Sequence, residues 1–273
     1  MTLPDIVPDV IRRSMRWLSP IVNGYFRSET RHFERVPEGA SIMVTSHDGG
    51  VLPLNGVCFG LHWYEHFGLG RTFFVLTHDM LHGLLPSFTR LLTESGLIKA
   101  DKKNLDAALD TGRPVLIFPG AARESFRTFW ARKEVDLGGR RGFVAAAIRH
   151  GVPIVPVATA GAHETLFVLS GGHSIARMLG IPKLVRSADV LPLLAGLPWG
   201  IWFIPFLPQF PLPAKIVNEV LEPVYPSEVI GRPLTPADAD DAEIVYRVFD
   251  EVLLRLRQAT ARLYDERKWP VIG

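Results

Sequence analysis

The chain has 273 residues, which is long enough for one large domain or two small ones to bury a substantial core. Hydrophobic residues make up 47% and charged residues 21%, which excludes a disordered chain, and the mean hydropathy of +0.16 is high for a freely soluble enzyme. The single cysteine, Cys58, excludes a disulfide framework and a cysteine-rich zinc module, and a formal net charge of +2 argues against a nucleic-acid partner.

The first 35 residues predict a helical segment with a basic face. Residues 1–8 hold one acid, two prolines and no long apolar run, so we predict no secretory signal. Residues 10–27 carry four arginines and no acid, with apolar residues close to helical spacing. Such a helix suits an anionic membrane surface, with Trp17 at the interface. Pro20 interrupts the pattern, and packing of the segment on its own domain is the alternative.

The remaining residues, 36–273, predict one α/β domain. Short β-rich runs occur at Ser41–Thr45, Arg71–Thr77, Pro114–Phe118, Pro153–Ala158 and Lys215–Leu221. Helices are predicted at Pro53–Phe67, Asp79–Ser95, Lys102–Asp110 and Arg141–His150, and a long C-terminal helix is expected to be capped by Thr235. This alternation, with unbroken apolar strands, favours a mostly parallel central sheet covered by helices on both faces.

Residues 190–213 form the most apolar part of the chain and carry no charge. Their length alone would allow a membrane-spanning helix, but six prolines argue against one, because each removes a helical hydrogen-bond donor. We expect an irregular apolar loop or a short helical hairpin that dips into one leaflet or covers an apolar channel. An ordinary buried core segment is the alternative.

A histidine follows the first predicted strand, in the sequence Ser46-His47-Asp48-Gly49-Gly50. Parallel α/β sheets place their chemistry at such strand ends, and the glycines permit close approach of a substrate. His47 could take a proton from a hydroxyl near neutral pH, and Asp48 could fix its tautomer and stabilise the imidazolium. A turn-capping histidine without a catalytic role is the alternative.

Two further segments offer contacts for a polar or anionic substrate. The candidate residues are Gly120, Ala121, Arg123, Glu124, Arg140 and Arg141. The first four follow a strand, where the small residues leave N–H groups open to an oxygen anion and the arginine offers a forked donor. The last two open a predicted helix, where basic residues oppose the helix dipole unless an anion, such as the phosphates of coenzyme A, binds there. An ordinary turn and solvated arginines are the alternatives.

Two histidine pairs at helical spacing are candidate metal ligands. His62, Glu65 and His66 match the His-x-x-Glu-His pattern of one class of zinc peptidase, but no third ligand can be identified. We therefore expect no metal site, and a zinc hydrolase stays an alternative. His78 and His82 are expected to make structural hydrogen bonds. A serine hydrolase is not supported, because Gly-x-Ser-x-Gly is absent.

Four segments taken together resemble the phospholipid/glycerol acyltransferase superfamily, and within it a bacterial branch similar to the diacylglycerol and monoacylglycerol acyltransferase family. The segments are SHDGGVLPLNG (46–56), VLIFPGAARES (115–125), RRGFVAAAIRHGVPIVPVATAGAHE (140–164) and the proline-rich stretch after it. The resemblance implies an O-acyltransferase of lipid metabolism that transfers a fatty acyl group from acyl-CoA or an acyl carrier protein to a lipid or glycerolipid hydroxyl, with no cofactor or metal. It also implies work at the cytoplasmic face of a membrane, as a peripheral or monotopic protein.

In this resemblance His47 would deprotonate the acceptor hydroxyl, which attacks the thioester carbonyl directly, so that no acyl-enzyme forms. The chain departs from the phospholipid-making branch, which has an aspartate where this chain has Leu52, and Asn55 stands where related sequences often carry an acid. The orienting partner of His47 is therefore open between Asp48, a distant carboxylate and none.

The segment Phe-Pro-Gly-Ala-Ala-Arg-Glu also differs from the Phe-Pro-Glu-Gly-Thr-Arg of the phospholipid-making branch and resembles the Gly-Gly-x-x-Glu of the neutral-lipid branch. This difference favours a neutral acceptor, with Arg123 and Glu124 positioning it or stabilising the fold of the site. A lysophospholipid or lysophosphatidate acyltransferase, and a non-catalytic lipid-binding protein, are the alternatives.

Overall fold

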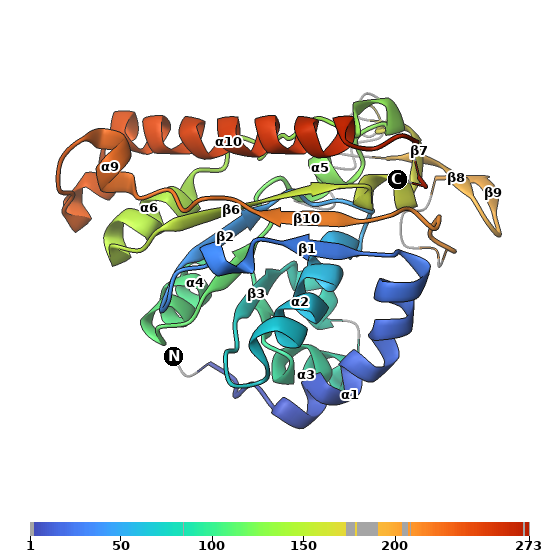
Figure 1. Ribbon diagram of the computed structural model, residues 1–273, viewed down its shortest axis with the longest axis horizontal. Coiled ribbons are helices and arrows are strands. Elements are labelled where there is room, and N and C mark those ends of the chain that lie inside the picture. Colours follow the sequence, from blue (N-terminus) through green and yellow to red (C-terminus); the bar gives the residue numbers. More distant parts are fainter. Residues whose placement is uncertain are drawn as a thin grey trace.

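The computed structural model describes residues 3–83, 85–172, 178, 191–203, 207, 209–269 and 271–272. Within them the centre of the molecule is a sheet of seven strands (Figure 1). In spatial order the strands are β1 (Glu29–Arg31), β10 (Val217–Val220), β6 (Ile154–Ala160), β2 (Ile42–Thr45), β5 (Val115–Ile117), β3 (Phe74–Thr77) and β4 (Leu97–Lys99). Every neighbouring pair is parallel except β10 with β6, which confirms the predicted mostly parallel sheet.

Helices cover both faces of the sheet, as predicted (Figure 1). One face carries α4 (Lys102–Asp110), α6 (Gly142–His150) and the long C-terminal helix α10 (Ala242–Asp265), which also contacts α9 (Pro226–Ile230). The other carries α1 (Pro8–Ser19), α2 (Leu54–Phe67) and α3 (Pro86–Glu94). Successive side chains of a strand point to opposite faces, so Val115 and Ile117 join the core under α10 while Leu116 joins the core under α2.

The sequence predicted most of these elements. Each of the five predicted strands overlaps one observed strand, with β6 running two residues beyond its predicted end, and the helices predicted at 53–67, 102–110 and 141–150 are confirmed to within one residue at each end. The pattern did not predict β1 and β4, because each has three residues and neither is a continuous apolar run. Both strands lie at the edges of the sheet.

Two predicted helices begin elsewhere than expected. The helix predicted over 79–95 is divided into a 3-10 turn, η3 (Asp79–Gly83), and α3, because α3 starts at Pro86, whose ring fits only the first turn of a helix. Thr235 caps a short 3-10 helix, η6 (Pro236–Asp240), whereas α10 is capped by Asp241. The prediction that Thr235 caps the long helix was therefore wrong.

The N-terminal segment packs along one side only. α1 continues through Pro20 into a π-helical turn, η1 (Pro20–Tyr25), and Ile11 and Val22 are buried against the domain. On the outer side Trp17 is 77% exposed, Ile21 48% and Tyr25 43%. The segment thus packs on its own domain and also presents an apolar surface outward.

Residues 191–203 form a β-hairpin, which corrects the expected loop or helical hairpin. β8 (Leu193–Gly196) and β9 (Gly200–Trp202) join β7 (Phe167–Ser170) in a small antiparallel sheet. Proline excludes a helix here but is tolerated outside paired strands, and Pro198 lies in the hairpin turn. Residues 190, 204–206 and 208 of the predicted apolar stretch lie outside the described residues. Among the described residues no helix combines the length and apolar character needed to cross a membrane.

Candidate active site

The carboxyl ends of β2, β5 and β6 bring three loops together in the middle of the sheet. These strands are parallel neighbours, so residues 46–50, 119–125 and 161–165 leave the sheet at the same edge. His47 follows the last residue of β2, Thr45, by two positions, and it is partly exposed. The histidine therefore lies at the end of a central strand, where the sequence predicted it.

The imidazole of His47 is held through one ring nitrogen. Its Nδ1 lies 2.5 Å from the Ser125 hydroxyl, and its backbone N–H donates to Glu124 Oε2 at 2.9 Å. The ring packs edge-on against Phe118, with centroids 5.5 Å apart. Nε2 makes no hydrogen bond to any residue that the structure describes. Burial lowers the pKa of His47 to about 4, against the opposing charge of Asp48, so the ring is neutral near pH 7.

Asp48 is bound to groups other than the imidazole. Its carboxylate is buried, accepts the Ser46 hydroxyl at 2.6 Å and forms an ion pair with Arg127. A buried carboxylate needs a charged partner, and Arg127 supplies it. Among the partners left open for His47, Asp48 is thus engaged elsewhere, and the contact of the ring at Nδ1 is with Ser125, which was not among them.

The 119–125 loop is built around a buried glutamate. Glu124 is 1% exposed, and its second oxygen, Oε1, accepts the N–H of Asp136 at 3.2 Å. Gly120 leaves room for this side chain, since a Cβ there would lie 2.1 Å from Glu124 Oε2. Ala121 has a left-handed φ of +49° and begins the short helix α5 (Ala121–Ser125). Burial raises the pKa of Glu124 to about 8. The Glu124 side chain thus connects the 119–125 loop to the backbone of His47. Of the two roles considered for Glu124, acceptor positioning and stabilisation of the site, these contacts correspond to the second.

The three predicted arginines do not converge on one site. Arg141 places its guanidinium over the Tyr246 ring of α10, 3.4 Å from the ring centroid. Arg140 is exposed and donates to the Pro119 carbonyl at 2.8 Å. Arg123 is exposed on the 119–125 loop. The expected anion site at the start of α6 is therefore not formed by Arg141, because that side chain is engaged by an aromatic ring.

Several buried polar residues near His47 were not singled out from the sequence. His163 is fully buried, and its Nε2 donates to the Arg127 carbonyl at 2.8 Å. Burial, assisted by the positive charge of Arg127, lowers the pKa of His163 to about 3. Glu164, also fully buried, pairs with Arg132 at 3.0 Å. The only sequence signal for these residues was the Gly-x-x-Glu at the end of the 140–164 segment. Their contacts could not be predicted, because no local pattern contains information on contacts between loops of different strands.

The histidines of the zinc pattern bind different partners. His62 lies 2.8 Å from Thr30 Oγ1 through Nδ1 and 3.1 Å from Asn23 Oδ1 through Nε2, so both ring nitrogens link α2 to the N-terminal segment. His66 stacks on Phe33, with ring centroids 5.1 Å apart. No group of three or more metal-binding side chains is found in the described ranges. The zinc-hydrolase alternative therefore has no supporting geometry.

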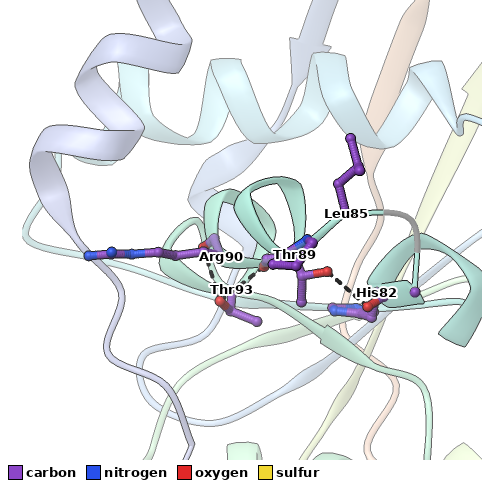
Figure 2. Close-up of a pocket in the computed structure, with 7 residues that line it drawn as sticks. His82, Leu85, Thr89, Arg90 and Thr93 are labelled. Carbon is purple, nitrogen blue, oxygen red and sulfur yellow. Dashed lines mark hydrogen bonds between the residues drawn. The ribbon is translucent and has the colours of Figure 1, made fainter.

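A hollow of about 430 Å³ lies beside α3, beyond the carboxyl end of β3 (Figure 2). His82 reaches back from it to Thr77, with Nε2 2.8 Å from Oγ1, which confirms the structural hydrogen bond predicted for this histidine. Thr89 donates to the His82 carbonyl at 2.8 Å, and Arg90 pairs with Glu94. The polar groups on its wall are thus engaged by the protein itself.

Comparison with known proteins identifies the family of the chain. Residues 18–170 match the family described as diacylglycerol acyltransferase. An uncharacterized protein of Mycobacterium tuberculosis is 26% identical over 267 residues, which cover 97% of this chain and 68% of that protein. Human diacylglycerol O-acyltransferase 2 is 30% identical over 83 residues, which cover 29% of this chain and 21% of that enzyme.

A solved structure shares the fold. The crystal structure of the 1-acyl-sn-glycerophosphate acyltransferase from Thermotoga maritima superimposes with a TM-score of 0.54 at 15% identity, over 96% of this chain and 80% of that one. The two proteins thus share the fold of a mostly parallel sheet covered by helices on both faces. The family match spans more than half of the sequence, and the chain belongs to the diacylglycerol acyltransferase family.

Proposed function

We propose that this acyltransferase moves a fatty acyl group from acyl-CoA or an acyl carrier protein to the hydroxyl of a lipid or glycerolipid, with His47 as the general base. The observation that carries the proposal is the His47 ring itself. It is neutral near pH 7, it is fixed through Nδ1, and among the described residues nothing binds Nε2. A neutral, positioned imidazole is the form that a general base requires.

The transfer would occur in one displacement. Nε2 of His47 takes the proton of the acceptor hydroxyl as the oxygen attacks the thioester carbonyl. The tetrahedral intermediate collapses, the carbon–sulfur bond breaks, and the thiolate takes the proton back from His47. One ester and one free thiol are formed. Cys58 is an unsuitable nucleophile, because burial raises the pKa of its thiol to about 12.

The charges around His47 support a neutral acceptor such as monoacylglycerol or diacylglycerol. Arg127 is paired with the buried Asp48, and Arg141 is stacked on Tyr246. Both cations are therefore engaged by the protein and are less available to a phosphate headgroup than the exposed Arg123 and Arg140. Arg123, exposed on the loop next to His47, is our candidate for contact with the acceptor or the donor, and Gly120 and Ala121 for the backbone of the oxyanion side.

We also propose that the enzyme works at a membrane surface, as a peripheral or monotopic protein on its cytoplasmic face. The β8–β9 hairpin exposes Leu197, Ile201 and Phe203 by 71%, 66% and 51%. The opposite side of the same small sheet packs on the site, since Trp202 shares a buried cluster with Phe126, the neighbour of Ser125. Bilayer contact at the hairpin would thus hold the loops around His47 near the lipid.

The N-terminal segment contributes to the same end of the molecule (Figure 1). Tyr25 donates its hydroxyl to the Pro211 carbonyl at 2.5 Å, and Arg27 donates to the Pro213 carbonyl at 2.6 Å. These bonds join the exposed apolar side of η1 to the chain that follows the hairpin. The N-terminal segment and the apolar stretch around the hairpin, which the sequence indicated separately, are therefore proposed to face the membrane together.

Product analysis of the purified protein tests the proposal. Wild type and His47→Ala are incubated with palmitoyl-CoA and with diacylglycerol, monoacylglycerol, lysophosphatidate or a long-chain alcohol, and esters and released thiol are measured together. We expect an ester from a neutral acceptor, with turnover lower by about 10² or more in His47→Ala. His66→Ala, an exposed histidine stacked on Phe33, serves as the matched control and should retain activity.

Each outcome of this assay has a distinct meaning. A fall of less than about tenfold in His47→Ala would remove His47 from the role of base. An ester formed only on lysophosphatidate would replace the neutral acceptor by a phosphorylated one. Thiol release with free fatty acid and no ester would contradict transfer to any hydroxyl in the panel.

A further inference from the structure

We infer that Ser125 is a positioning residue that holds His47 in the tautomer protonated at Nδ1, which leaves the lone pair of Nε2 for the substrate. The inference deepens the proposed function, because it assumes that His47 is the base. It assigns to a serine hydroxyl the orienting task for which the sequence suggested Asp48.

The inference rests on the donor and acceptor roles of the Ser125 hydroxyl. Ser125 Oγ lies 2.5 Å from His47 Nδ1 and 2.9 Å from the Ala121 carbonyl oxygen. A hydroxyl has one proton to donate, and a carbonyl oxygen can only accept. When the hydroxyl donates to Ala121, its contact with His47 is a hydrogen bond only if Nδ1 carries the proton. Both contacts are satisfied together in this tautomer alone.

The surroundings keep the hydroxyl in place. Ser125 has no exposed surface, so water does not compete for Oγ. It ends α5, and the preceding residue, Glu124, anchors that helix through the backbone N–H groups of His47 and Asp136. The serine and the histidine are thus connected twice, by the side-chain contact and by the bond from the His47 backbone. Such double support is what a preorganised base requires.

The residues that could have supplied a carboxylate are engaged elsewhere. Asp48 pairs with Arg127, and Leu52 is 49% exposed and apolar. Asn55 is buried and donates to Thr45 Oγ1 at 3.2 Å and to the Ser46 carbonyl at 2.8 Å, so its amide holds the loop backbone. A neutral hydroxyl on Nδ1 does not stabilise the imidazolium as a carboxylate would, which agrees with the lowered pKa of His47.

The burial of Ser125 also separates this role from that of a nucleophile. An acylated serine would need its oxygen in contact with the thioester carbonyl, whereas this oxygen is enclosed by the protein. A serine that only orients a histidine never carries the acyl group. Mass spectrometry of the enzyme after mixing with palmitoyl-CoA should therefore find no acyl group on Ser125.

The decisive measurement is the tautomer of His47 in the wild-type enzyme. Nitrogen-15 NMR of the imidazoles distinguishes a protonated ring nitrogen from one with a free lone pair, and His47→Gln identifies the signals among the nine histidines. We expect a protonated Nδ1 and an unprotonated Nε2 at pH 7. Protonation at Nε2 would overturn the inference, and this measurement requires no variant of Ser125 to fold.

The kinetics of the Ser125→Ala variant provides a second test of the positioning role. We expect kcat to fall by about tenfold to hundredfold with KM within about threefold, because the base is mispositioned and substrate contacts are kept. The His47 signals should show increased protonation at Nε2. Ser41→Ala is the matched control, since Ser41, which directly precedes β2, is equally buried and its hydroxyl has no partner among the described residues.

The outcomes separate this inference from the function on which it rests. Folded Ser125→Ala with kcat within twofold of wild type, while His47→Ala is inactive, would overturn the positioning role and leave His47 as the base. Activity retained in His47→Ala would contradict the proposed base itself. An acyl group found on Ser125 would make the serine a nucleophile and overturn both the positioning role and direct transfer.

Discussion

His47 and His163 remain uncharged beside a buried ion pair. Burial lowers their pKa values to about 4 and about 3. The ion pair between Asp48 and Arg127 is balanced without them, so a proton on either ring would add an uncompensated charge to the site. The fold therefore keeps both rings neutral, and this lowers the stability of the protein at acidic pH.

Acid should destabilise the protein through these histidines. Their folded pKa values lie below the ordinary 6.5, so between pH 6.5 and about 4 the unfolded chain binds protons that the folded chain does not. Each histidine lowers the free energy of unfolding by up to about 1.4 kcal/mol per pH unit as pH falls through this window, while the raised pKa of Glu124 gives the opposite slope and offsets one of the two, so a net fall is expected. Denaturation curves at pH 7, 6 and 5 would measure it. In His163→Gln, whose amide can still donate to the Arg127 carbonyl, we expect a shallower dependence; an unchanged one would show that His163 titrates normally.

At the scale of elements, α5 and the β8–β9 hairpin determine the shape of the site. α5 depends on Gly120, because any side chain there would occupy the position of Glu124 Oε2. The hairpin turns Trp202 inward to the site and Ile201 outward, as the alternation of a strand requires. The site thus depends on the room that Gly120 leaves for Glu124 in α5, and on the inward-facing Trp202 of the hairpin, whose other side is exposed.

Gly120→Ala should displace Glu124 and loosen the loop that carries Ser125. We expect a loss of about 1–3 kcal/mol in the free energy of unfolding, as for other overpacked positions, together with reduced turnover. Gly142→Ala, at the start of α6, is the control, because no atom lies within 4 Å of its added Cβ and its φ needs no glycine. Equal stability of the two variants would show that Glu124 moves aside at no cost.

The outer side of the hairpin should determine membrane binding. Replacing Ile201 and Phe203 by serine removes exposed apolar surface and leaves the buried Trp202 in place. We expect the fraction bound to phosphatidylcholine–phosphatidylglycerol vesicles to fall at least about fivefold, since each side chain would contribute apolar burial in the bilayer. Leu254→Ser, on the exposed side of α10, is the matched control. Unchanged sedimentation with vesicles would mean that the hairpin does not face lipid.

The elements differ in how far the sequence predicts them, for a physical reason. Strands buried on both faces, such as β5 and β6, appear as continuous apolar runs, and His47 is found because it follows such a run. The β8–β9 hairpin was not predicted, because its prolines exclude a helix without distinguishing a loop from paired strands. The contact of His47 with Ser125 depends on β2 and β5 being neighbours, which no local pattern contains.

At the scale of the whole molecule, Glu164 joins remote parts of the chain. Its Oε1 pairs with Arg132 of the loop after α5, and its Oε2 lies 2.8 Å from Arg267 and accepts the N–H of Val271 at 2.7 Å. Glu164 itself leads from β6 into the small sheet. One buried carboxylate therefore fastens the C-terminal segment to the edge of the sheet that carries the site.

Glu164→Gln should destabilise the whole protein. Removing the charge leaves the buried guanidinium of Arg267 and the partly exposed one of Arg132 without this counterion, and breaking a buried pair typically costs about 3–5 kcal/mol. Glu243→Gln, an exposed residue in the first turn of α10, is the control, with an expected effect below about 0.5 kcal/mol. Chemical denaturation measures both. A change below about 1 kcal/mol for Glu164→Gln would mean that water or other groups balance the arginines.

The pairing of β1 with β10 has a consequence for biosynthesis. Residues 29–31 lie beside residues 217–219, and Phe26 shares a buried cluster with Ile216. Such non-local pairing makes folding slow, because a long loop must close before the contact forms. During synthesis β1 therefore stays unpaired until β10 has left the ribosome. One edge of β6 stays unpaired for the same time, because β10 is also its neighbour. Truncation before β10 should thus yield aggregating chains rather than a smaller active enzyme, since an unpaired apolar edge is a template for association.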